Sequence, residues 1–218
     1  MISKTPIVSA TAAALLGLAF LSAPASAADA AAPQPYAVMH ADATGTYAVD
    51  PDHSSVSWVI GHAGIVPCAG VFKKVSGTFT FDPVNSAADK ADITVAVDSI
   101  DSYMPLRNEH LKSANFFDAA KYPDIHFVST RYVPEGKEAG KLYGNITLHG
   151  VTKPAVFSVT LEGAGKVGYL PKPWGGFLGG FVATTTVDRM DFGISAYPAG
   201  LSHTVDITVR LEGVRQGS

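Results

Sequence analysis

Histidine and cysteine are the residue types in this sequence that most readily bind metal ions or act as nucleophiles. The chain has one cysteine, Cys68, and seven histidines, at His40, His53, His62, His110, His126, His149 and His203. No two histidines have the spacing of a helical zinc site, and a site of paired cysteines is impossible. The spacing favours structural or surface imidazoles, unless the fold brings three of them together. At Cys68 a buried small side chain is expected, with an intermolecular disulfide or a reactive thiol as alternatives.

Two short motifs match catalytic signatures but lack the context that those signatures need. Gly163–Gly168 has the glycine spacing of a dinucleotide-binding loop, but the segment Tyr169–Pro173 follows it, where a helix would have to begin. We therefore predict a hairpin loop there. Asp191–Gly193 matches a kinase motif without its partner motifs, so a turn is predicted in which Asp188 and Arg189 pair with or cap nearby backbone. The sequence predicts no catalytic residue.

A third group of polar residues lies in the segment Leu106–Lys112, which is rich in helix formers. Arg107 and His110 are three positions apart in it, so on a helix they project from the same face. Such a helix would interrupt a series of strands and would lie at their rim. There Arg107, His110 and His62 could contact the headgroup of a bound ligand. The alternative is that Arg107 and His110 only cap or brace the inserted segment. A second short helix is predicted to begin in Asn115–Asp118.

The elements that must position these residues are mostly strands. From Thr46 onward apolar and polar residues alternate with a period of two, as in Val56–Ile60 and Val75–Phe81. Turn clusters such as Asp82–Asn85 and Gly150–Pro154 separate these segments. About eight or nine strands are expected, and many short antiparallel strands predict a sandwich or a closed barrel.

One face of these strands carries large apolar side chains. In most β proteins such residues fill the core, whereas in a barrel wide enough to stay open they line a ligand cavity. The sequence leaves both possibilities open. The residues assigned to this apolar interior are Trp58, Ile60, Phe79, Phe81, Val95, Val97, Phe127, Ile146, Phe157, Val159, Phe181 and Ile207.

The N-terminus has the order of a secretory signal peptide. Lys4 precedes the apolar stretch Ala12–Leu21, and the small-residue triplet Ala25–Ala27 follows. The apolar stretch is shorter than the roughly 20 residues of a membrane-spanning helix. We predict a signal peptide over residues 1–27, cleavage after Ala27, and a periplasmic location. A disordered spacer over residues 28–45 and one domain over residues 46–214 would follow.

Charge and hydropathy limit the partners of the mature chain. Without Lys4, 15 basic residues stand against 19 acidic ones, a net charge of −4. No block of like charge stands out, which argues against a nucleic-acid partner. No second apolar run is long enough to span a bilayer, so the mature protein is expected to be soluble.

Several ordered stretches resemble the YceI-like family, also called lipid- or polyisoprenoid-binding domains, over nearly all of residues 46–213. They are Tyr47–Asp50 with His53-Ser54, Gly70–Phe72, Ser76-Gly77, Phe81–Pro83, Arg107–Leu111, Asn115–Asp118, Lys121–Pro123, Phe127–Ser129, Gly144–Pro154 and Asp188–Gly193. Three positions depart from the family's common residues. Asn108 and Asn145 replace aspartates, and Leu178 replaces an arginine that would be available to a headgroup.

The resemblance implies a lipocalin-like antiparallel barrel of about eight strands, with a short helical insertion near the mouth of an apolar interior. The implied ligand is a long-chain apolar lipid such as an isoprenoid quinone or a polyprenyl lipid. No metal, resident cofactor or catalytic residue is implied. A membrane b-type cytochrome or another lipid donor is the expected partner, and a homodimer stays open. The alternatives are a stress-related structural or interaction protein with a filled barrel, and an enzyme acting on a bound lipid.

Overall fold

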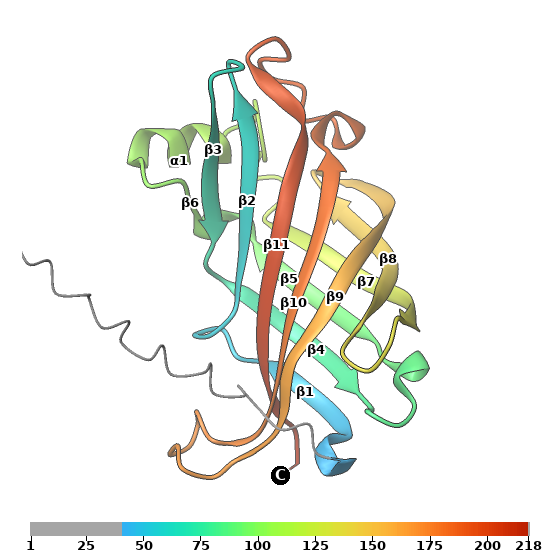
Figure 1. Ribbon diagram of the computed structural model, residues 1–218. Coiled ribbons are helices and arrows are strands. Elements are labelled where there is room, and N and C mark those ends of the chain that lie inside the picture. Colours follow the sequence, from blue (N-terminus) through green and yellow to red (C-terminus); the bar gives the residue numbers. More distant parts are fainter. Residues whose placement is uncertain (1–40, 218) are drawn as a thin grey trace, which may run out of the picture. The chain divides into compact units, whose positions relative to one another are not determined.

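The alternating segments of the sequence form eleven strands in the computed structural model, which describes residues 41–217 (Figure 1). The strands are β1 Gly45–Val49, β2 Ser55–His62, β3 Val66–Phe72, β4 Val75–Phe81, β5 Ala91–Ala96, β6 Ile100–Asp101, β7 Asp124–Pro134, β8 Ala139–Leu148, β9 Val151–Val167, β10 Gly176–Asp188 and β11 Leu201–Arg215. The helices are α1 Pro105–Lys112 and the 3-10 helices η1 Ala41–Ala43, η2 Ser86–Ala88, η3 Val97–Ser99 and η4 Arg189–Phe192.

Eight of these strands close a barrel. They follow the order β1-β4-β5-β7-β8-β9-β10-β11, and β11 pairs again with β1, with Tyr47 opposite Arg215. Every pairing is antiparallel. On the edge of β11 that faces β1, residues Leu201–Arg210 pair with β2, and β3 and β6 follow beyond it. The predicted closed antiparallel barrel of about eight strands with a helical insertion is confirmed.

The segment between β6 and β7 contains one helix, as predicted for Leu106–Lys112. Pro105 occupies the start of α1, where a missing N–H costs nothing, and His110 and Lys112 lie in its last turn. Of the one or two helices expected here, the second, at Asn115–Asp118, does not form, because these residues form turns and Asp118 has a φ of 47°. Phe116 and Phe117 in these turns pack against the barrel core instead.

The predicted hairpin loop at Gly163–Gly168 is also wrong for most of its length. β9 continues to Val167, and Ala164 and Leu178 lie in the paired region of β9 and β10. On β11, Gly213, which pairs with Gly179, makes room for an aromatic ring, because a Cβ there would lie 2.5 Å from the ring of Phe79. Similarly, the predicted turn Gly150–Pro154 is shorter, since β9 begins at Val151.

The folded region begins earlier than the predicted boundary at residue 46. Ala41–Ala43 form η1, and the buried Ala43 accepts a hydrogen bond from the Tyr47 hydroxyl. The predicted signal peptide, its cleavage site and residues 28–40 of the predicted spacer lie outside the described residues. Within residues 41–217, no helix has both the length and the apolar character needed to cross a membrane.

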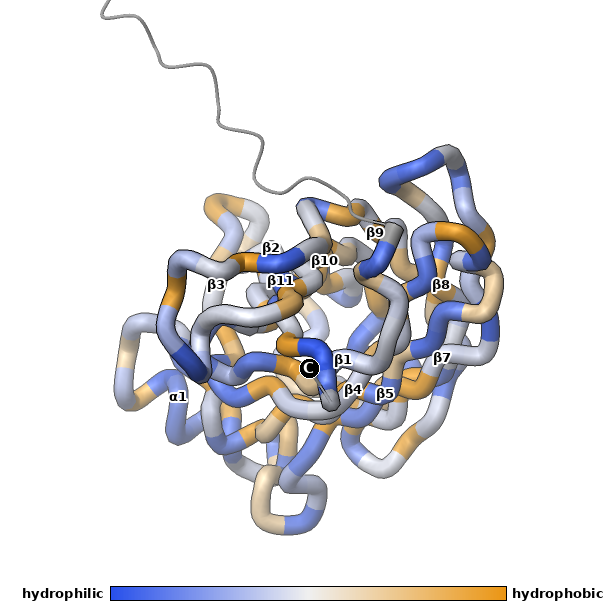
Figure 2. Tube along the Cα trace, turned by 90° about the horizontal axis from the view of Figure 1, so that it is seen from below, coloured by the Kyte–Doolittle hydropathy of each residue, from blue (hydrophilic) through white to orange (hydrophobic). Residues whose placement is uncertain are grey.

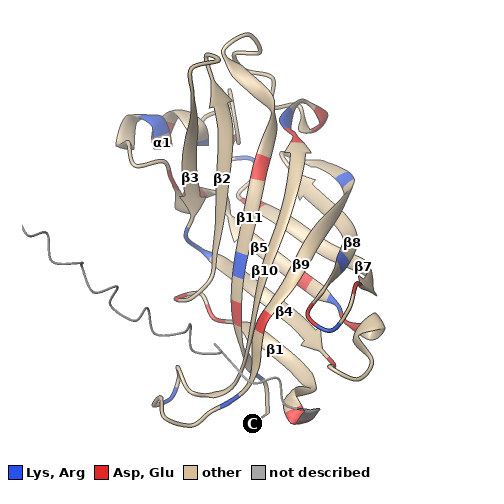
Figure 3. Cartoon of the chain, in the orientation of Figure 1, with Lys and Arg blue, Asp and Glu red and all other residues tan. Residues whose placement is uncertain are grey.

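The inward faces of the strands form two buried clusters, which include Tyr47, Trp58 and Phe79 in one and Phe116 and Phe157 in the other. Figure 2 shows hydrophobic and hydrophilic residues interspersed along the strands. Figure 3 shows acidic and basic residues scattered over the strands and loops, with both signs mixed. No face of the domain therefore carries charges of one sign only. We turn to the interior of the barrel for a candidate binding site.

Candidate functional site

The barrel contains two internal cavities. The larger, which we call cavity A, has a volume of about 460 Å³ and is lined by alternate residues of β2, β5, β7 and β11, such as Val56, Ile93, Ile125 and Val205. The smaller, cavity B, has a volume of about 350 Å³ and is lined by residues of β4 and of β5, β7 and β11. The open-barrel interpretation of the large apolar residues therefore describes the structure better than a filled core.

The structure divides the predicted apolar residues between the two cavities. Those in the wall of cavity A are Trp58, Ile60, Val95, Phe127, Ile146, Phe157 and Ile207. Those in the wall of cavity B are Phe79, Phe81, Val159 and Phe181. Val97 lines neither cavity, and its assignment is wrong: it is buried in η3, where the chain leaves the strand and its alternation ends.

One layer of side chains separates the cavities. On β9, Phe157 lines cavity A and Val159, two residues on, lines cavity B. The same step occurs on β11 between Val209 and Leu211. Phe157 packs edge-on against Phe127, with ring centroids 5.0 Å apart. The sequence could not reveal this division, because alternation marks an inward residue without fixing its depth.

Polar side chains of cavity A gather at one end, which we call the mouth and define by His62, Arg107, His110, Arg189 and Tyr197. His62 ends β2 and pairs with Leu201, whose N–H donates to the Tyr197 carbonyl. The Tyr197 and His110 rings pack edge to face, with their centroids 5.8 Å apart. The structure thus brings the three predicted headgroup residues, His62, Arg107 and His110, to the same cavity.

Arg107 both lines the cavity and braces the inserted segment. Its Nε donates to Ser102 Oγ at 2.9 Å, and its Nη2 donates to the Ser102 carbonyl. Asn108 Oδ1 accepts from the Ser102 N–H at 2.7 Å and from its hydroxyl at 2.6 Å. The Cys68 Sγ lies 4.0 Å from Arg107 Nη1, so the partly buried thiol is part of the same wall. Arg107 therefore braces the inserted segment, and it also faces the cavity in which the headgroup contact is predicted.

Arg189 is a cavity residue that sequence reasoning missed. It is 4% exposed, and it donates hydrogen bonds to the carbonyls of Ser202, Ile194, Ala196 and Leu201. Burial lowers its pKa, although a guanidinium stays charged in proteins. The predicted capping is confirmed, because Asp188 Oδ1 accepts from the Met190 N–H at 2.8 Å.

Strand alternation does not reach Arg189. Val187 lines cavity A from β10, but β10 ends at Asp188, and Arg189 is the first residue of η4. Its place in the wall therefore depends on the turn that follows the strand and not on a period of two.

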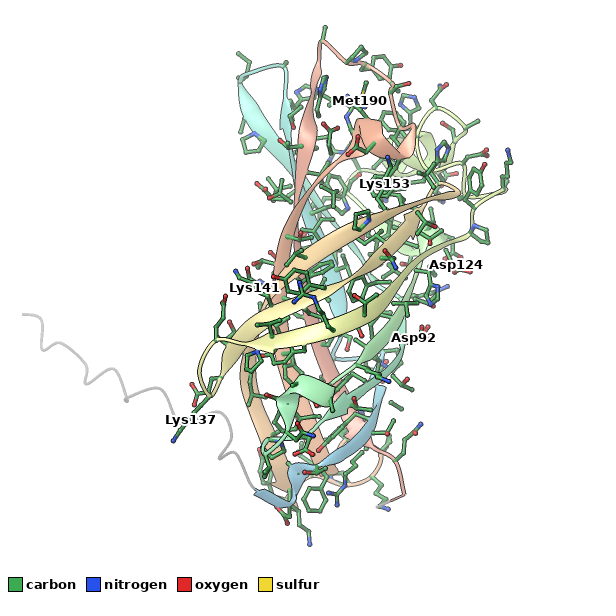
Figure 4. The ribbon with its side chains drawn as sticks, turned by 90° about the vertical axis from the view of Figure 1, so that its right-hand side faces the viewer. Asp92, Asp124, Lys137, Lys141, Lys153 and Met190 are labelled. Carbon is green, nitrogen blue, oxygen red and sulfur yellow. The ribbon has the colours of Figure 1, made fainter. Side chains whose placement is uncertain are left out.

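The outer end of cavity B carries charges of both signs. Asp89, Lys90, Lys137 and Glu138 line it, from the β4–β5 and β7–β8 connections. Burial raises the pKa of Asp89 to about 7, against the opposing effect of the Asp82 N–H, which donates to its carboxyl at 2.8 Å. Lys137 at this end and Met190 of η4 lie at opposite ends of the domain (Figure 4).

The histidines do not converge on a metal site within residues 41–217. The one group there with metal-binding potential is Asp50, His53 and Glu212, whose ligand atoms lie within 4.8 Å of one another. His53 Nδ1 is 2.9 Å from Asp50 Oδ2 and 3.8 Å from Glu212 Oε1. The hydrogen bond that His53 donates to the Asp50 carboxylate raises the pKa of His53, which is the behaviour of an ion pair.

A closed antiparallel barrel with an apolar cavity and polar groups at one end defines a lipocalin-like binding protein. The chain belongs to the YceI-like family, whose domain model matches residues 47–213. A UPF0312 protein of Pseudomonas putida is 40% identical over 172 residues, which cover 78% of this chain and 86% of the relative.

Solved structures agree with this assignment. BcnA of Burkholderia cenocepacia is 27% identical, with a TM-score of 0.66 over 75% of this chain and 98% of its own. A polyisoprenoid-binding domain from Saccharophagus degradans shares the fold at 14% identity, with a TM-score of 0.55 over 78% of this chain and 98% of its own. The family and the cavity together make this a YceI-like barrel with an apolar interior.

Proposed function

We propose that the protein is a periplasmic carrier for a long-chain apolar lipid, an isoprenoid quinone or a polyprenyl lipid. The tail lies in cavity A, and the headgroup lies at the mouth near His62, Arg107 and His110. The observation that carries the proposal is cavity A, whose volume of about 460 Å³ falls in the range of roughly 300–1,000 Å³ that is usual for small-molecule sites. The protein binds and releases its cargo without a chemical step.

Burial of the tail supplies most of the affinity. Each buried methylene contributes about 0.8 kcal/mol, so ten of them contribute about 8 kcal/mol before the costs of binding. An exposed ion pair with a headgroup contributes only about 0–1 kcal/mol. The tail therefore sets the strength of binding, and the headgroup tunes it.

Two further features support the proposal. The Saccharophagus degradans domain with the same fold is named for polyisoprenoid binding. The interior is open, whereas the alternative of a structural protein with a filled barrel requires side chains to occupy it. The periplasmic location rests on the leader-like order of residues 1–27, and a membrane b-type cytochrome or another lipid donor would exchange the cargo.

Mass spectrometry tests the function directly. The protein is expressed with its own N-terminus, purified from the periplasm without detergent, and extracted with organic solvent. We expect an isoprenoid lipid at about one per chain and an intact mass that begins at Ala28. Folded protein that yields no lipid and takes up none from isoprenoid-loaded vesicles contradicts the carrier function. Protein that retains residues 1–27 in the membrane fraction contradicts the location.

A further inference from the structure

A groove lies on the outer face of the barrel, and we call it groove C. It has a volume of about 570 Å³, and its wall includes the hairpin loop between β9 and β10, at the end of the barrel away from α1 (Figure 1). None of its described lining residues lines cavity A or cavity B. Groove C is therefore a separate site from the one proposed for the lipid.

Glycines form the floor of groove C. Gly180 on β10 pairs with Gly163 on β9 and with Glu212 on β11. A Cβ at Gly180 would meet no atom closer than 3.8 Å, so the missing side chain leaves open space. Glycine inside a strand often marks a place where a ligand approaches the backbone. The floor between β9 and β11 is accessible in this way.

Two carboxylates flank this floor. Glu162 lies at a β-bulge, because the pairing of β9 with β10 passes from Leu161 to Gly163 without it. Glu212 lies on the opposite side of Gly180, on β11. Neighbouring strands are about 4.8 Å apart, so the backbones that carry the two glutamates lie about 10 Å apart across β10. A small cationic group fits between two side chains at this separation.

The negative charge of these two carboxylates is not compensated. Glu162 forms no hydrogen bond or ion pair within residues 41–217. Glu212 has His53 at 3.8 Å, but His53 is closer to Asp50, at 2.9 Å. Burial raises the pKa of Glu212 in spite of His53, so this carboxylate would gain from a further cation. No lysine or arginine is among the described residues that line the groove.

The rest of the wall is apolar and aromatic. Tyr169 is 85% exposed and Trp174 is 44% exposed, and Leu170 and Leu178 lie in the same wall. The face of an aromatic ring attracts a cation, and tryptophan does so most strongly. Aromatic rings beside unpaired carboxylates therefore suit a ligand that combines a positive charge with an apolar body.

We propose that groove C binds an organic cation, an ammonium group attached to an aliphatic or aromatic body. The ammonium group lies over Gly180, between Glu162 and Glu212. The body lies against Tyr169 and Trp174. This site does not depend on the lipid carrier function, because it shares no lining residue with the cavities.

A bare metal ion suits these residues less well. Asp50, His53 and Glu212 have ligand atoms within 4.8 Å of one another. However, Asp50 and His53 already bind each other, and Asp50 Oδ1 also accepts from the Asp52 N–H at 2.9 Å. A metal ion would also gain nothing from aromatic and leucine side chains, since it prefers oxygen, nitrogen and sulfur ligands.

Three ligands with one indole body and different headgroups test this in the purified, isotope-labelled protein. They are tryptamine, tryptophol and indolepropionate, and the NMR amide signals of Gly163 and Gly165 report binding. We expect the amine to bind about tenfold more tightly than the alcohol, because its charge interacts with the carboxylates and the rings. Indolepropionate should bind most weakly. Protein loaded with lipid should bind tryptamine equally well.

Glu162→Gln removes a charge without breaking a contact, because Glu162 has no partner within residues 41–217. It should weaken tryptamine about 3- to 10-fold and leave tryptophol unchanged. Asp206→Asn is the matched control on the exposed face of β11, and asparagine keeps an acceptor for Thr186 Oγ1. Asp206 is about 20 Å along the strand from Glu212, beyond the screening length of about 8 Å, so tryptamine binding should stay unchanged.

Gly180→Val tests the floor without a change of charge. The Cβ has room, and valine is favoured in strands, so the barrel should stay folded, as a thermal melt would show. The added side chain occupies the gap between the two glutamates. It should therefore weaken tryptamine at least as much as Glu162→Gln does.

Several results would overturn the proposal and leave the lipid carrier standing. Equal affinities of the three ligands, or equal effects of Asp206→Asn and Glu162→Gln, would show that the carboxylates of groove C do not recognise the charge. Shifts at Ile207 without shifts at Gly163 would place the indole in cavity A. Zinc chloride that shifts the amides of the groove, together with tryptamine that does not, would make this a metal site instead.

Discussion

Cavities A and B share β5, β7, β8, β9, β10 and β11, yet their outer ends differ in chemistry. Cavity A ends at α1 and η4, with two arginines and no carboxylate among the described lining residues. Cavity B ends at the β4–β5 and β7–β8 connections, where Asp89 and Glu138 balance Lys90 and Lys137. The strand alternation that makes both interiors apolar does not determine either end. The connections place two guanidinium groups at one end and side chains of both charge signs at the other.

Removal of the partition should have the largest effect. Phe157→Ala deletes a buried ring between the cavities and should lower the free energy of unfolding by about 3–5 kcal/mol. It should also move the preferred length of bound polyprenols upward, because cavity A then opens toward cavity B. Denaturant unfolding and competition among polyprenols of increasing length measure the two effects.

Phe81→Ala is the control for this prediction, since Phe81 is buried to a similar extent but lines cavity B. It should destabilise the barrel by a similar amount and leave the length preference unchanged. An equal shift in both variants would mean that cavities A and B already act as one site.

The headgroup contact of Arg107 should have the next largest effect. Arg107→Ala should weaken binding of a polar-headed lipid by about 1–3 kcal/mol and leave a headless hydrocarbon of equal length untouched. Its bonds to Ser102 each contribute about 0.5–1.5 kcal/mol to stability, so a modest decrease in melting temperature is expected as well. Equal loss of both ligands together with a large decrease in melting temperature would assign Arg107 to structure alone.

The balanced end of cavity B should respond to pH. The pKa of Asp89 is raised to about 7 in the folded protein, so its carboxyl binds a proton more tightly there than in the unfolded chain. Its contribution to stability is fully present below about pH 4 and is lost as the pH rises to about 7. Asp89→Asn keeps an acceptor for the Asp82 N–H and removes the charge.

Denaturant unfolding at two pH values checks this. Asp89→Asn should be more stable than the wild type by about 1–2 kcal/mol at pH 8, a value discounted for the solvent near this carboxyl, and the difference should shrink at pH 4. If the difference in stability between Asp89→Asn and the wild type were the same at pH 4 and pH 8, the pKa of Asp89 would not be raised in the folded protein.

Substitutions on the outer face should have the smallest effects. Ser158 and Thr184 are exposed neighbours of inward-facing residues on β9 and β10. Lysine at either position should change the free energy of unfolding by less than about 0.5 kcal/mol and leave lipid retention intact. Loss of retained lipid in Ser158→Lys, measured by mass spectrometry, would mean that the inward face of β9 has been misassigned.

The sequence predicted those parts of the molecule that local patterns decide. A period of two marks a half-buried strand wherever it occurs, and α1 follows from a run of helix formers. Gly163–Gly165 was assigned to a loop because glycine spacing cannot distinguish a turn from glycines inside a paired strand. Val97 was assigned to the interior wall because the residue types around it do not predict that the strand ends and η3 begins there.

The residues of the mouth were predicted only in part, because local sequence patterns identify some of them and not others. Arg107 and His110 were found by their helical spacing, which is local, whereas Arg189 meets them only through the contacts of Tyr197 and Ala196. The hydrogen-bond partners of Arg189 are backbone carbonyls up to 13 residues away. Every residue has such a carbonyl, so the sequence does not indicate which ones Arg189 will contact. The division into cavities A and B depends on depth along the barrel, which no single strand encodes.

The pairing of β3 has a consequence for how a lipid enters. On the edge away from β2, β3 pairs within the described residues only at Val71 and Phe72, with β6. By contrast, β10 and β11 are paired continuously from Leu178 to Asp188. Opening the wall beside α1 therefore breaks far fewer backbone hydrogen bonds than opening it at β10 and β11. Amide protons of α1 and of Val66–Gly70 should exchange with deuterium long before those of β10, and lipid uptake should follow the faster of these two openings.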